Sequence, residues 1–267
     1  MEKEIVGLLA VLLCCVIVAS CQKKGPEDTT ASSESETESE TSEEDDGISE
    51  GDHILFGTYP QSVISGTDTF ETEPIEWRVL EIRDGKALIM SEYLLDAAMY
   101  YYDMADITWE KSSIRKWLNE KFYDAAFSDS EKSLIQTATI KNDDNPLYGT
   151  PGGNDTEDKV FCLSLEEAQL YFTGTEDRMS ALTDYAVSRG ASVNEENKPE
   201  SGMKTGWWWL RTPASSANRA AEVDCFGNID TVKNADGVDG CLVFSEGICV
   251  RPVVWITLTD SIEEYKP

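Results

Sequence analysis

The sequence predicts an α+β fold with an antiparallel sheet for residues 51–267. Apolar runs typical of strands open this region, helical patterns occupy its middle, and strand-like runs return in its last third. A parallel βαβ array would instead alternate strands and helices along the chain. No internal repeat and no clear break in composition follows residue 51, so we expect one folded domain.

The first strands are expected where apolar residues cluster, at 53–56, 75–82 and 86–91. Asp84-Gly85 stands between the second and third runs, and an Asp-Gly pair in that place predicts a tight β-hairpin. In the last third, strands are expected at 207–212, 220–224, 242–245 and 250–257. The last of these is largely apolar, which is typical of a central strand.

Several short helices are expected between the two groups of strands. Residues 112–122 carry apolar side chains at the spacing of one helix face. Ser128 with Glu131, and Ser164 with Glu167, have the spacing of capping boxes that begin helices. A further helix is expected at 179–189, ended by Gly190. Long polar loops separate these elements, notably at 142–158 and 192–206.

The N-terminus carries an export signal. Residues 5–19 form an apolar run that is too short to span a bilayer comfortably and that ends in small residues. The run closes on Val18-Ala19-Ser20-Cys21, which resembles a bacterial lipobox, in which the cysteine is diacylated. We expect a signal peptide at 1–20, lipidation of Cys21, and a lipid anchor in the cell membrane with the protein facing outside. An ordinary signal peptide or an uncleaved anchor is the alternative.

Residues 21–50 are expected to form a disordered linker behind the lipidated cysteine. From residue 27 onward this segment is nearly all Glu, Asp, Ser and Thr. Such a composition buries too little apolar surface to offset the entropy of ordering, and its like charges extend it. We interpret it as a spacer, and a calcium-collecting acidic tail is the alternative.

The charge of the chain excludes several classes of partner. It holds 51 acidic and 22 basic residues, a formal net charge of −29. This balance repels nucleic acid, and it disfavours docking on an anionic membrane through basic patches. His53 is the only histidine, so multi-histidine metal sites are excluded, and no G-x-S-x-G motif provides a nucleophile.

The segment from Trp207 to Arg211 is the first candidate for ligand binding. In a strand, Trp207, Trp209 and Arg211 would face one side, where aromatic faces stack on sugars or peptides and an arginine orients a carboxylate. Asp224 and Asn228 follow in the next loop and complete the predicted set. The expected ligand is an extracellular glycan, peptide or cell-wall polymer. The alternative is that both faces are buried and the arginine makes structural ion pairs.

The loop at 142–158 is a candidate calcium site. Calcium binds six to eight oxygen atoms from carboxylates, amides and carbonyls. This loop supplies such oxygens through Asp143, Asp144, Asn154, Asp155 and Asp158. The alternative is turn chemistry, since Asn, Asp and Gly side chains and backbones suit tight loops. No other cofactor is indicated.

Five segments in order resemble a known family. They are Phe-Gly-Thr-Tyr-Pro-Gln at 56–61, Pro-Ile-Glu-Trp-Arg-Val-Leu at 74–80, Thr-Pro-Gly-Gly-Asn-Asp-Thr at 150–156 with Asp-Lys-Val-Phe at 158–161, Trp-Trp-Leu-Arg-Thr-Pro at 208–213, and Val-Arg-Pro-Val-Val-Trp-Ile at 250–256. Together they resemble a domain-of-unknown-function family of surface and secreted proteins of clostridia and other gut Firmicutes. The C-terminal third is similar to the C-type-lectin-like fold of formylglycine-generating and sulfatase-modifying proteins. The resemblance implies one C-type-lectin-like domain over 51–267.

The cysteines after Cys21 suggest disulfides, because an even number in an exported chain is typical of them. The family usually has polar residues or glycine where Cys225 and Cys249 stand. This departure suggests that these two form a local disulfide, with each other or with Cys241. Cys162 lies in an apolar run and is expected to be a buried free thiol. A thiol pair binding Cu(I) is the alternative.

Two classes of function follow from these observations. We expect a lipid-anchored surface lipoprotein whose ectodomain is a binding module without catalysis. An enzyme on the formylglycine-generating scaffold, either a copper-thiol oxidase or a carboxylate hydrolase, is the alternative. A purely structural surface protein is the third option, because a fold alone does not decide among them.

Overall fold

The computed structural model describes residues 47–194, 202–229 and 239–267, which belong to one compact unit. The predicted signal peptide, Cys21 and the linker up to residue 46 lie outside the described residues. Within the described part, no helix is long and apolar enough to cross a membrane. Helices and antiparallel sheets are both present, which confirms the α+β class.

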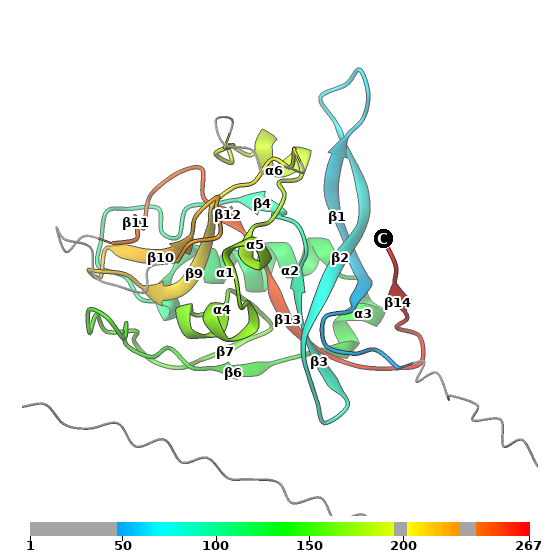
Figure 1. The fold of residues 1–267 in the computed structure, drawn as a ribbon, viewed down its shortest axis with the longest axis horizontal. Coiled ribbons are helices and arrows are strands. Elements are labelled where there is room, and N and C mark those ends of the chain that lie inside the picture. The colour runs from blue at the N-terminus through cyan, green and yellow to red at the C-terminus, as the bar shows by residue number, and fades with distance from the viewer. Residues whose placement is uncertain (1–46, 195–201, 230–238) are drawn as a thin grey trace, which may run out of the picture. The chain divides into compact units, whose positions relative to one another are not determined.

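A seven-stranded antiparallel sheet forms the first layer (Figure 1). Its path runs β14-β1-β2-β3-β13-β5, and β8 also pairs with β13. The strands are β1 (His53–Val63), β2 (Phe70–Arg83), β3 (Lys86–Ser91), β5 (Ile135–Gln136), β8 (Val160–Phe161), β13 (Val253–Thr257) and β14 (Glu264–Tyr265). The hairpin at Asp84-Gly85 is confirmed, because both residues have positive φ, 51° and 69°, as a type I′ turn requires.

The hairpin formed by β1 and β2 is longer than the strands expected at 53–56 and 75–82. Its polar outer halves pair with each other as far as Val63 opposite Phe70. Two register shifts interrupt this ladder, and such irregularities increase the local twist. The two strands therefore coil around each other and project from the rest of the unit (Figure 1).

A second sheet has the order β11-β10-β9-β12-β4. Its strands are β4 (Asp96–Ala97), β9 (Trp208–Pro213), β10 (Arg219–Val223), β11 (Cys241–Leu242) and β12 (Cys249–Val250). All neighbours are antiparallel except β12 and β9, which pair in parallel at Cys249 and Trp208. A separate two-stranded sheet joins β6 (Ala138–Ile140) to β7 (Thr156–Asp158).

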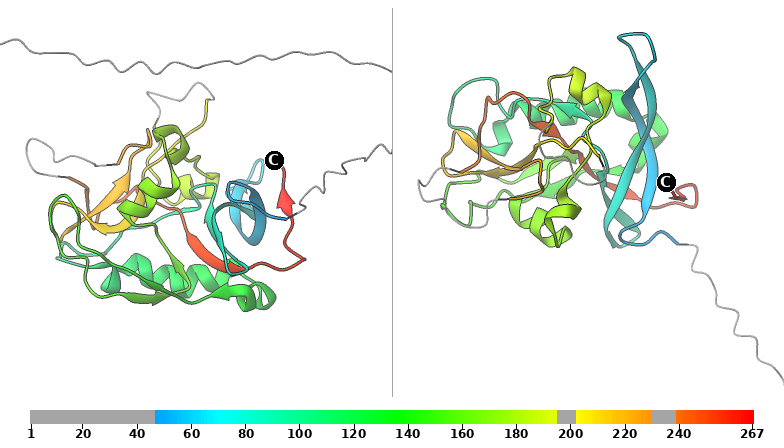
Figure 2. Two further views of the ribbon diagram at one scale, coloured as in Figure 1. Left: turned by 60° about the horizontal axis from the view of Figure 1, so that its bottom comes forward. Right: turned by 45° about the horizontal axis from the view of Figure 1, so that its top comes forward.

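Most helices are a single turn or two. A 3₁₀ turn, η1 (Trp109–Lys111), precedes one continuous helical run of α1 (Ser113–Trp117), the π-helical turn η2 (Leu118–Phe122) and α2 (Tyr123–Ala126). The others are α3 (Asp129–Leu134), α4 (Leu165–Tyr171), α5 (Thr175–Arg178) and α6 (Asp184–Ser188). The helical run lies along one side of the unit, drawn green in Figure 2.

The structure confirms the two capping boxes and corrects one helix. Ser128 and Ser164 each cap their helix, with Glu131 and Glu167 bonding back to the cap. The helix expected at 179–189 begins only at Asp184. The residues before it are extended because Ala181 and Leu182 form β-bridges with distant segments.

Four tryptophans, Trp77, Trp109, Trp208 and Trp209, are completely buried. Each indole N–H donates a hydrogen bond: the acceptors are Phe56 O, Asp158 Oδ2, Arg178 O and Ala98 O, at 2.6, 2.9, 3.2 and 2.8 Å. A buried indole without a partner would destabilise the fold, so these bonds fix where each ring lies.

Arg251 is also completely buried, and in the chain it lies between β12 of the second sheet and β13 of the first. Its guanidinium lies 5.3 Å from the ring centre of Trp208 and 5.4 Å from that of Phe172. Its Nε donates to Ser91 O at 2.9 Å. Burial lowers the pKa of Arg251 to about 10, and the nearby Glu92 carboxylate opposes this shift. The residue is therefore part of the core.

Replacing the first cap tests the helix assignments. Ser128→Ala removes the side chain that accepts from the Glu131 backbone N–H, so the free energy of unfolding should fall by about 1 kcal/mol. Urea denaturation followed by circular dichroism measures this loss. Ser133→Ala, an exposed change inside the same helix, is the control and should have little effect, because alanine favours helix. Equal effects of both changes would contradict the cap.

Candidate functional site

The predicted ligand-binding strand is buried instead of lining a groove. Every residue of β9 is buried, and Trp209 and Arg211 are 0% and 4% exposed. Trp207, just before the strand, is half-buried and packs against the core. The prediction that these side chains form an open groove is corrected, because other elements cover both faces of β9.

Arg211 uses all its donors inside the protein. Its Nε and Nη2 donate to Lys141 O at 3.1 and 3.0 Å, and its Nη1 donates to Cys162 O at 2.9 Å. Both terminal nitrogens also bind the Glu167 carboxylate, with Nη2 at 2.8 Å from Oε1. A guanidinium has five N–H donors, so none remains for a ligand. Arg211 therefore has the structural role that the sequence left as the alternative.

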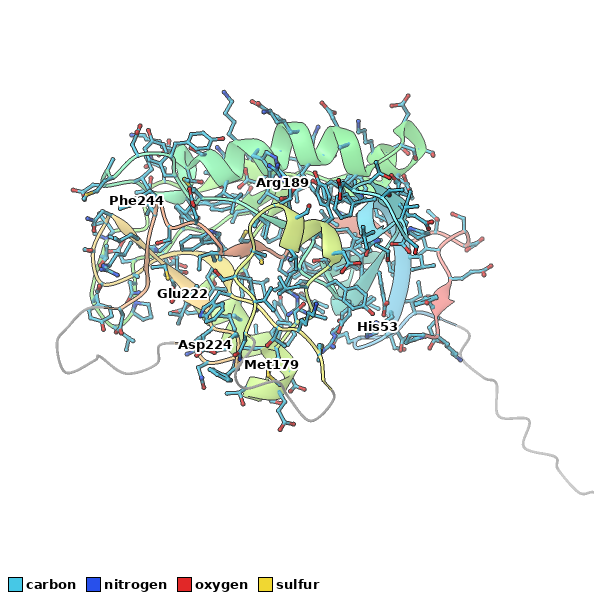
Figure 3. All side chains as sticks on the ribbon, turned by 90° about the horizontal axis from the view of Figure 1, so that it is seen from above. His53, Met179, Arg189, Glu222, Asp224 and Phe244 are labelled. Carbon is cyan, nitrogen blue, oxygen red and sulfur yellow. The ribbon has the colours of Figure 1, made fainter. Side chains whose placement is uncertain are left out.

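Asp224 and Asn228 form a closed turn. Asp224 Oδ1 accepts from the backbone N–H groups of Phe226 and Asn228, each at 2.8 Å. The Asn228 amide donates to Asp224 Oδ2 at 2.9 Å. Figure 3 shows Asp224 well apart from His53, the first residue of β1. The five predicted ligand-binding residues thus do not meet in one accessible site.

The predicted calcium residues serve the loop itself. Asp158 is 1% exposed and accepts from Trp109 Nε1, Arg115 Nε and Thr156 Oγ1, at 2.9, 2.6 and 2.7 Å. Asp155 pairs with Lys141 at 3.1 Å, and this hydrogen-bonded partner lowers the pKa of Asp155.

The remaining members of that set follow the same pattern. Asp144 Oδ1 accepts from Gly152 N at 3.0 Å, Asn154 donates to Glu110 at 3.1 Å, and Asp143 is exposed. No group of three or more His, Cys, Asp or Glu side chains that could hold a metal ion occurs among the described residues. The geometry favours turn chemistry over calcium binding.

The predicted disulfides are not formed. Cys162, Cys225 and Cys249 are free thiols. In the second sheet, two strands lie between β11, which carries Cys241, and β12, which carries Cys249. Three strand spacings amount to about 14 Å, whereas the Cα atoms of a disulfide lie within about 7 Å. Burial raises the pKa of Cys162 to about 12 and also raises that of Cys249, so reactive or metal-binding thiolates are disfavoured.

A different site lies against the long hairpin. We call it the hairpin groove, an open depression of about 520 Å³ between the β1–β2 hairpin, the segment before α6 and the C-terminal strand β14. Its lining combines apolar, aromatic and acidic side chains. The lining residues are Leu55, Gln61, Ser62, Glu73, Pro74, Glu76, Tyr93, Ala181, Leu182, Thr183, Asp184 and Tyr265.

Glu76 is the buried acid of the hairpin groove. It is 8% exposed, and its Oε1 lies 2.6 Å from Nδ1 of His53. The β1–β2 register brings these two together, because Glu76 lies opposite Leu55, which shares a face of β1 with His53. The Tyr93 hydroxyl also bonds Glu76, and burial followed by the charge of Glu76 raises the pKa of Tyr93.

Hydrogen bonds to the backbone fix the walls of the hairpin groove. Asp184 Oδ2 accepts from Val63 N at 3.1 Å, and Glu73 Oε2 accepts from Ser62 N at 2.9 Å. The Gln61 amide donates to Pro74 O at 2.9 Å. The acids therefore stand at fixed places around the depression.

The sequence alone did not indicate the hairpin groove. One signal was available: Glu76 interrupts an apolar run and the only histidine stands in the preceding strand. Tyr93, Asp184 and Tyr265 carry no such signal, because the tertiary fold alone brings them beside the hairpin.

Residues 84–258 match the family described as Domain of unknown function (DUF6273). The match covers more than half of the chain, and the chain therefore belongs to this family. No curated protein matches the chain, and no solved structure does. The matched residues include β9, both buried arginines and the π-helical turn, whereas the β1–β2 hairpin precedes them.

Removing the charge partner of Arg211 should destabilise the fold. Glu167→Gln leaves the buried Arg211 guanidinium without the charge of its partly exposed partner, which should lower the free energy of unfolding by about 1.5–3 kcal/mol. Chemical denaturation measures the change. Arg83→Ala, which removes a mostly exposed arginine paired with Glu81, should cost about 1 kcal/mol or less. A small loss for Glu167→Gln would contradict the structural role of Arg211.

The free thiols give a separate prediction. In the native full-length protein, iodoacetamide should leave Cys162 and Cys249 unmodified, because both are completely buried and their thiols stay protonated. In guanidinium chloride, Cys162, Cys225 and Cys249 should all be alkylated without a reductant. Peptide mass spectrometry identifies each site. If Cys225 or Cys249 required a reductant, a disulfide would be present and the structure contradicted.

Proposed function

We propose that this member of the DUF6273 family is an exported, lipid-anchored bacterial surface protein whose ectodomain binds a glycan in the hairpin groove. The sequence of residues 1–21 supports the anchor and the location outside the cell membrane. A C-type-lectin-like architecture is part of the proposal. Its support is that β9, which carries Arg211, and β12, which precedes Arg251, pair side by side in one sheet, as the corresponding strands do in the formylglycine-generating proteins that the C-terminal third resembles.

The observation that carries the proposal is the combination of side chains in the hairpin groove. Tyr93 and Tyr265 offer ring faces against which the C–H face of a sugar packs. Glu73, Glu76 and Asp184 offer carboxylate oxygens that accept hydrogen bonds from sugar hydroxyls. Concave sites that bind small ligands have this composition, an apolar or aromatic lining with a few fixed polar groups.

The charge of the groove narrows the ligand class. Three acids line it, and its lining contains no lysine or arginine. The chain as a whole carries −29. An anionic polymer would be repelled here, so the ligand is a neutral glycan or one that carries amino groups.

The enzyme alternative has less support. A copper-thiol oxidase needs accessible cysteine thiolates, whereas burial raises the pKa of Cys162 and of Cys249. For a carboxylate hydrolase, the described residues offer one candidate acid, Glu76, which is hydrogen-bonded to His53. The same pair also holds the wall of the hairpin groove in place.

Removing the tyrosine rings of the hairpin groove by substitution tests the proposal. The full-length protein in detergent is screened on an array of neutral, amino and acidic glycans, and a neutral or amino glycan should bind. Tyr93→Ala and Tyr265→Ala should each weaken binding about tenfold, the equivalent of one lost aromatic contact. Phe226→Ala is the matched control, since Phe226 is 42% exposed and lies outside the groove.

Two results would contradict this proposal. If no glycan binds, the protein has a protein partner or a structural role. If a glycan binds but only Phe226→Ala or Trp207→Ala weakens it, the ligand occupies another surface. Thermal melting of each variant confirms that the fold is intact.

A further inference from the structure

The charge around the hairpin groove is of one sign. Residues 54–77, which form most of the β1–β2 hairpin, contain four acidic residues and no lysine or arginine. Two of these acids, Glu73 and Glu76, line the groove, and Asp184, the first residue of α6, lines it as well. A ligand in the groove therefore meets carboxylates from the hairpin and from α6.

Glu73 and Asp184 are held near each other by the backbone of β1. Glu73 Oε2 accepts from Ser62 N at 2.9 Å, and Asp184 Oδ2 accepts from Val63 N at 3.1 Å. Because successive residues of a chain are about 3.8 Å apart, these two oxygens lie within about 10 Å of each other. The second oxygen of each carboxylate makes no hydrogen bond within the described part of the chain.

Neither of these two carboxylates has a basic partner. None of the ion pairs among the described residues includes Glu73 or Asp184. The basic residues nearest in sequence to the groove lining pair elsewhere: Arg78 with Glu92 at 2.9 Å, Arg189 with Asp96 at 3.3 Å, and Lys266 with Glu264 at 3.2 Å. Lys204 bonds Leu182 through its backbone and does not line the groove.

The aromatic part of the groove lies beside the third acid. Glu76 Oε1 is 2.6 Å from His53 Nδ1, and the Tyr93 hydroxyl bonds the same carboxylate. Burial, followed by the charge of Glu76, raises the pKa of Tyr93, and Tyr265 contributes in the same direction. The two tyrosines therefore stand near each other and near Glu76, whose charge the histidine can balance.

The unbalanced carboxylates favour a ligand with positive charge. Ionised carboxylates within about 10 Å of each other repel, and a positive group that enters the groove relieves this repulsion. A sugar hydroxyl can also donate to a carboxylate, but a hydrogen bond from an ammonium group is charge-assisted and about twice as strong. A neutral glycan would leave Glu73 and Asp184 without a counter-charge.

We propose that the hairpin groove selects a glycan with free amino groups, and that Glu73 and Asp184 determine this preference. This inference rests on the proposed glycan binding and deepens it. An ammonium group of the ligand donates to the second oxygen of Glu73 or of Asp184, and the sugar ring packs against Tyr93 or Tyr265. N-acetylation removes the charge of the amine, so the acetylated form of the same glycan binds less tightly.

The test compares glucosamine trisaccharide with its N-acetylated twin, which differs from it only at the amino groups. The full-length protein, in a detergent without a sugar head group, is titrated calorimetrically in mildly acidic buffer, in which the amines are protonated. The amine form should bind at least about tenfold more tightly, and added salt should weaken binding of this form only.

Two double variants assign the preference to the groove. Glu73→Gln with Asp184→Asn keeps oxygen atoms that accept from Ser62 N and Val63 N but removes both charges. It should reduce the preference to about threefold or less and leave the affinity for the acetylated form unchanged. The control, Asp68→Asn with Glu71→Gln, removes the same charge from exposed residues of the same hairpin that do not line the groove. It should leave the preference unchanged.

Trilysine, which has ammonium groups but no sugar ring, separates a glycan site from a site for basic peptides, and it should bind more weakly than the amine trisaccharide. The inference is overturned if the acetylated form binds as tightly as the amine form, if the control variant reduces the preference as much as the groove variant, or if trilysine binds more tightly than either sugar.

Failure of this inference is distinguishable from failure of the proposed function. If both trisaccharides bind equally and Tyr93→Ala weakens both, glycan binding in the hairpin groove stands and the selection of amino groups is wrong. If neither trisaccharide binds up to millimolar concentration, the inference fails, and a blank glycan array then removes the proposed function as well.

Discussion

The ion pair between the buried Arg211 and the partly exposed Glu167 fixes the arrangement of the interior. Arg211 binds the carbonyls of residues 141 and 162 and the carboxylate on α4, so one side chain connects β9 to a loop, a strand end and a helix. Glu167 also closes the capping box of α4 through Ser164 N at 2.8 Å. A buried guanidinium without partners is costly, so the bonds of Arg211 hold each connected segment in place.

This constraint decides where a ligand can bind. Because Trp208, Trp209, Arg211 and Arg251 all lie in the core, the motif richest in aromatic and cationic side chains is unavailable at the surface. Accessible aromatic and acidic side chains lie instead at the hairpin groove.

The sequence predicted features that depend on neighbouring residues only. The Asp84-Gly85 hairpin and both capping boxes follow from local chemistry, and they are present. The burial of β9 could not be predicted, because it depends on which distant elements cover each face. The contact of Glu76 with His53 depends on the β1–β2 register. The π-helical turn at Leu118–Phe122 has no established sequence signature and could not be predicted.

Ligand contacts are proposed at the hairpin groove, while β9 has a structural role. Hydroxyl-radical footprinting of the full-length protein, with and without the best-bound oligosaccharide of the glycan array, tests this assignment most directly. The oligosaccharide should protect Tyr93 and Tyr265 and cause no change at Trp207 or Phe226. Protection of Trp207 and Phe226, with Tyr93 and Tyr265 unchanged, would contradict it.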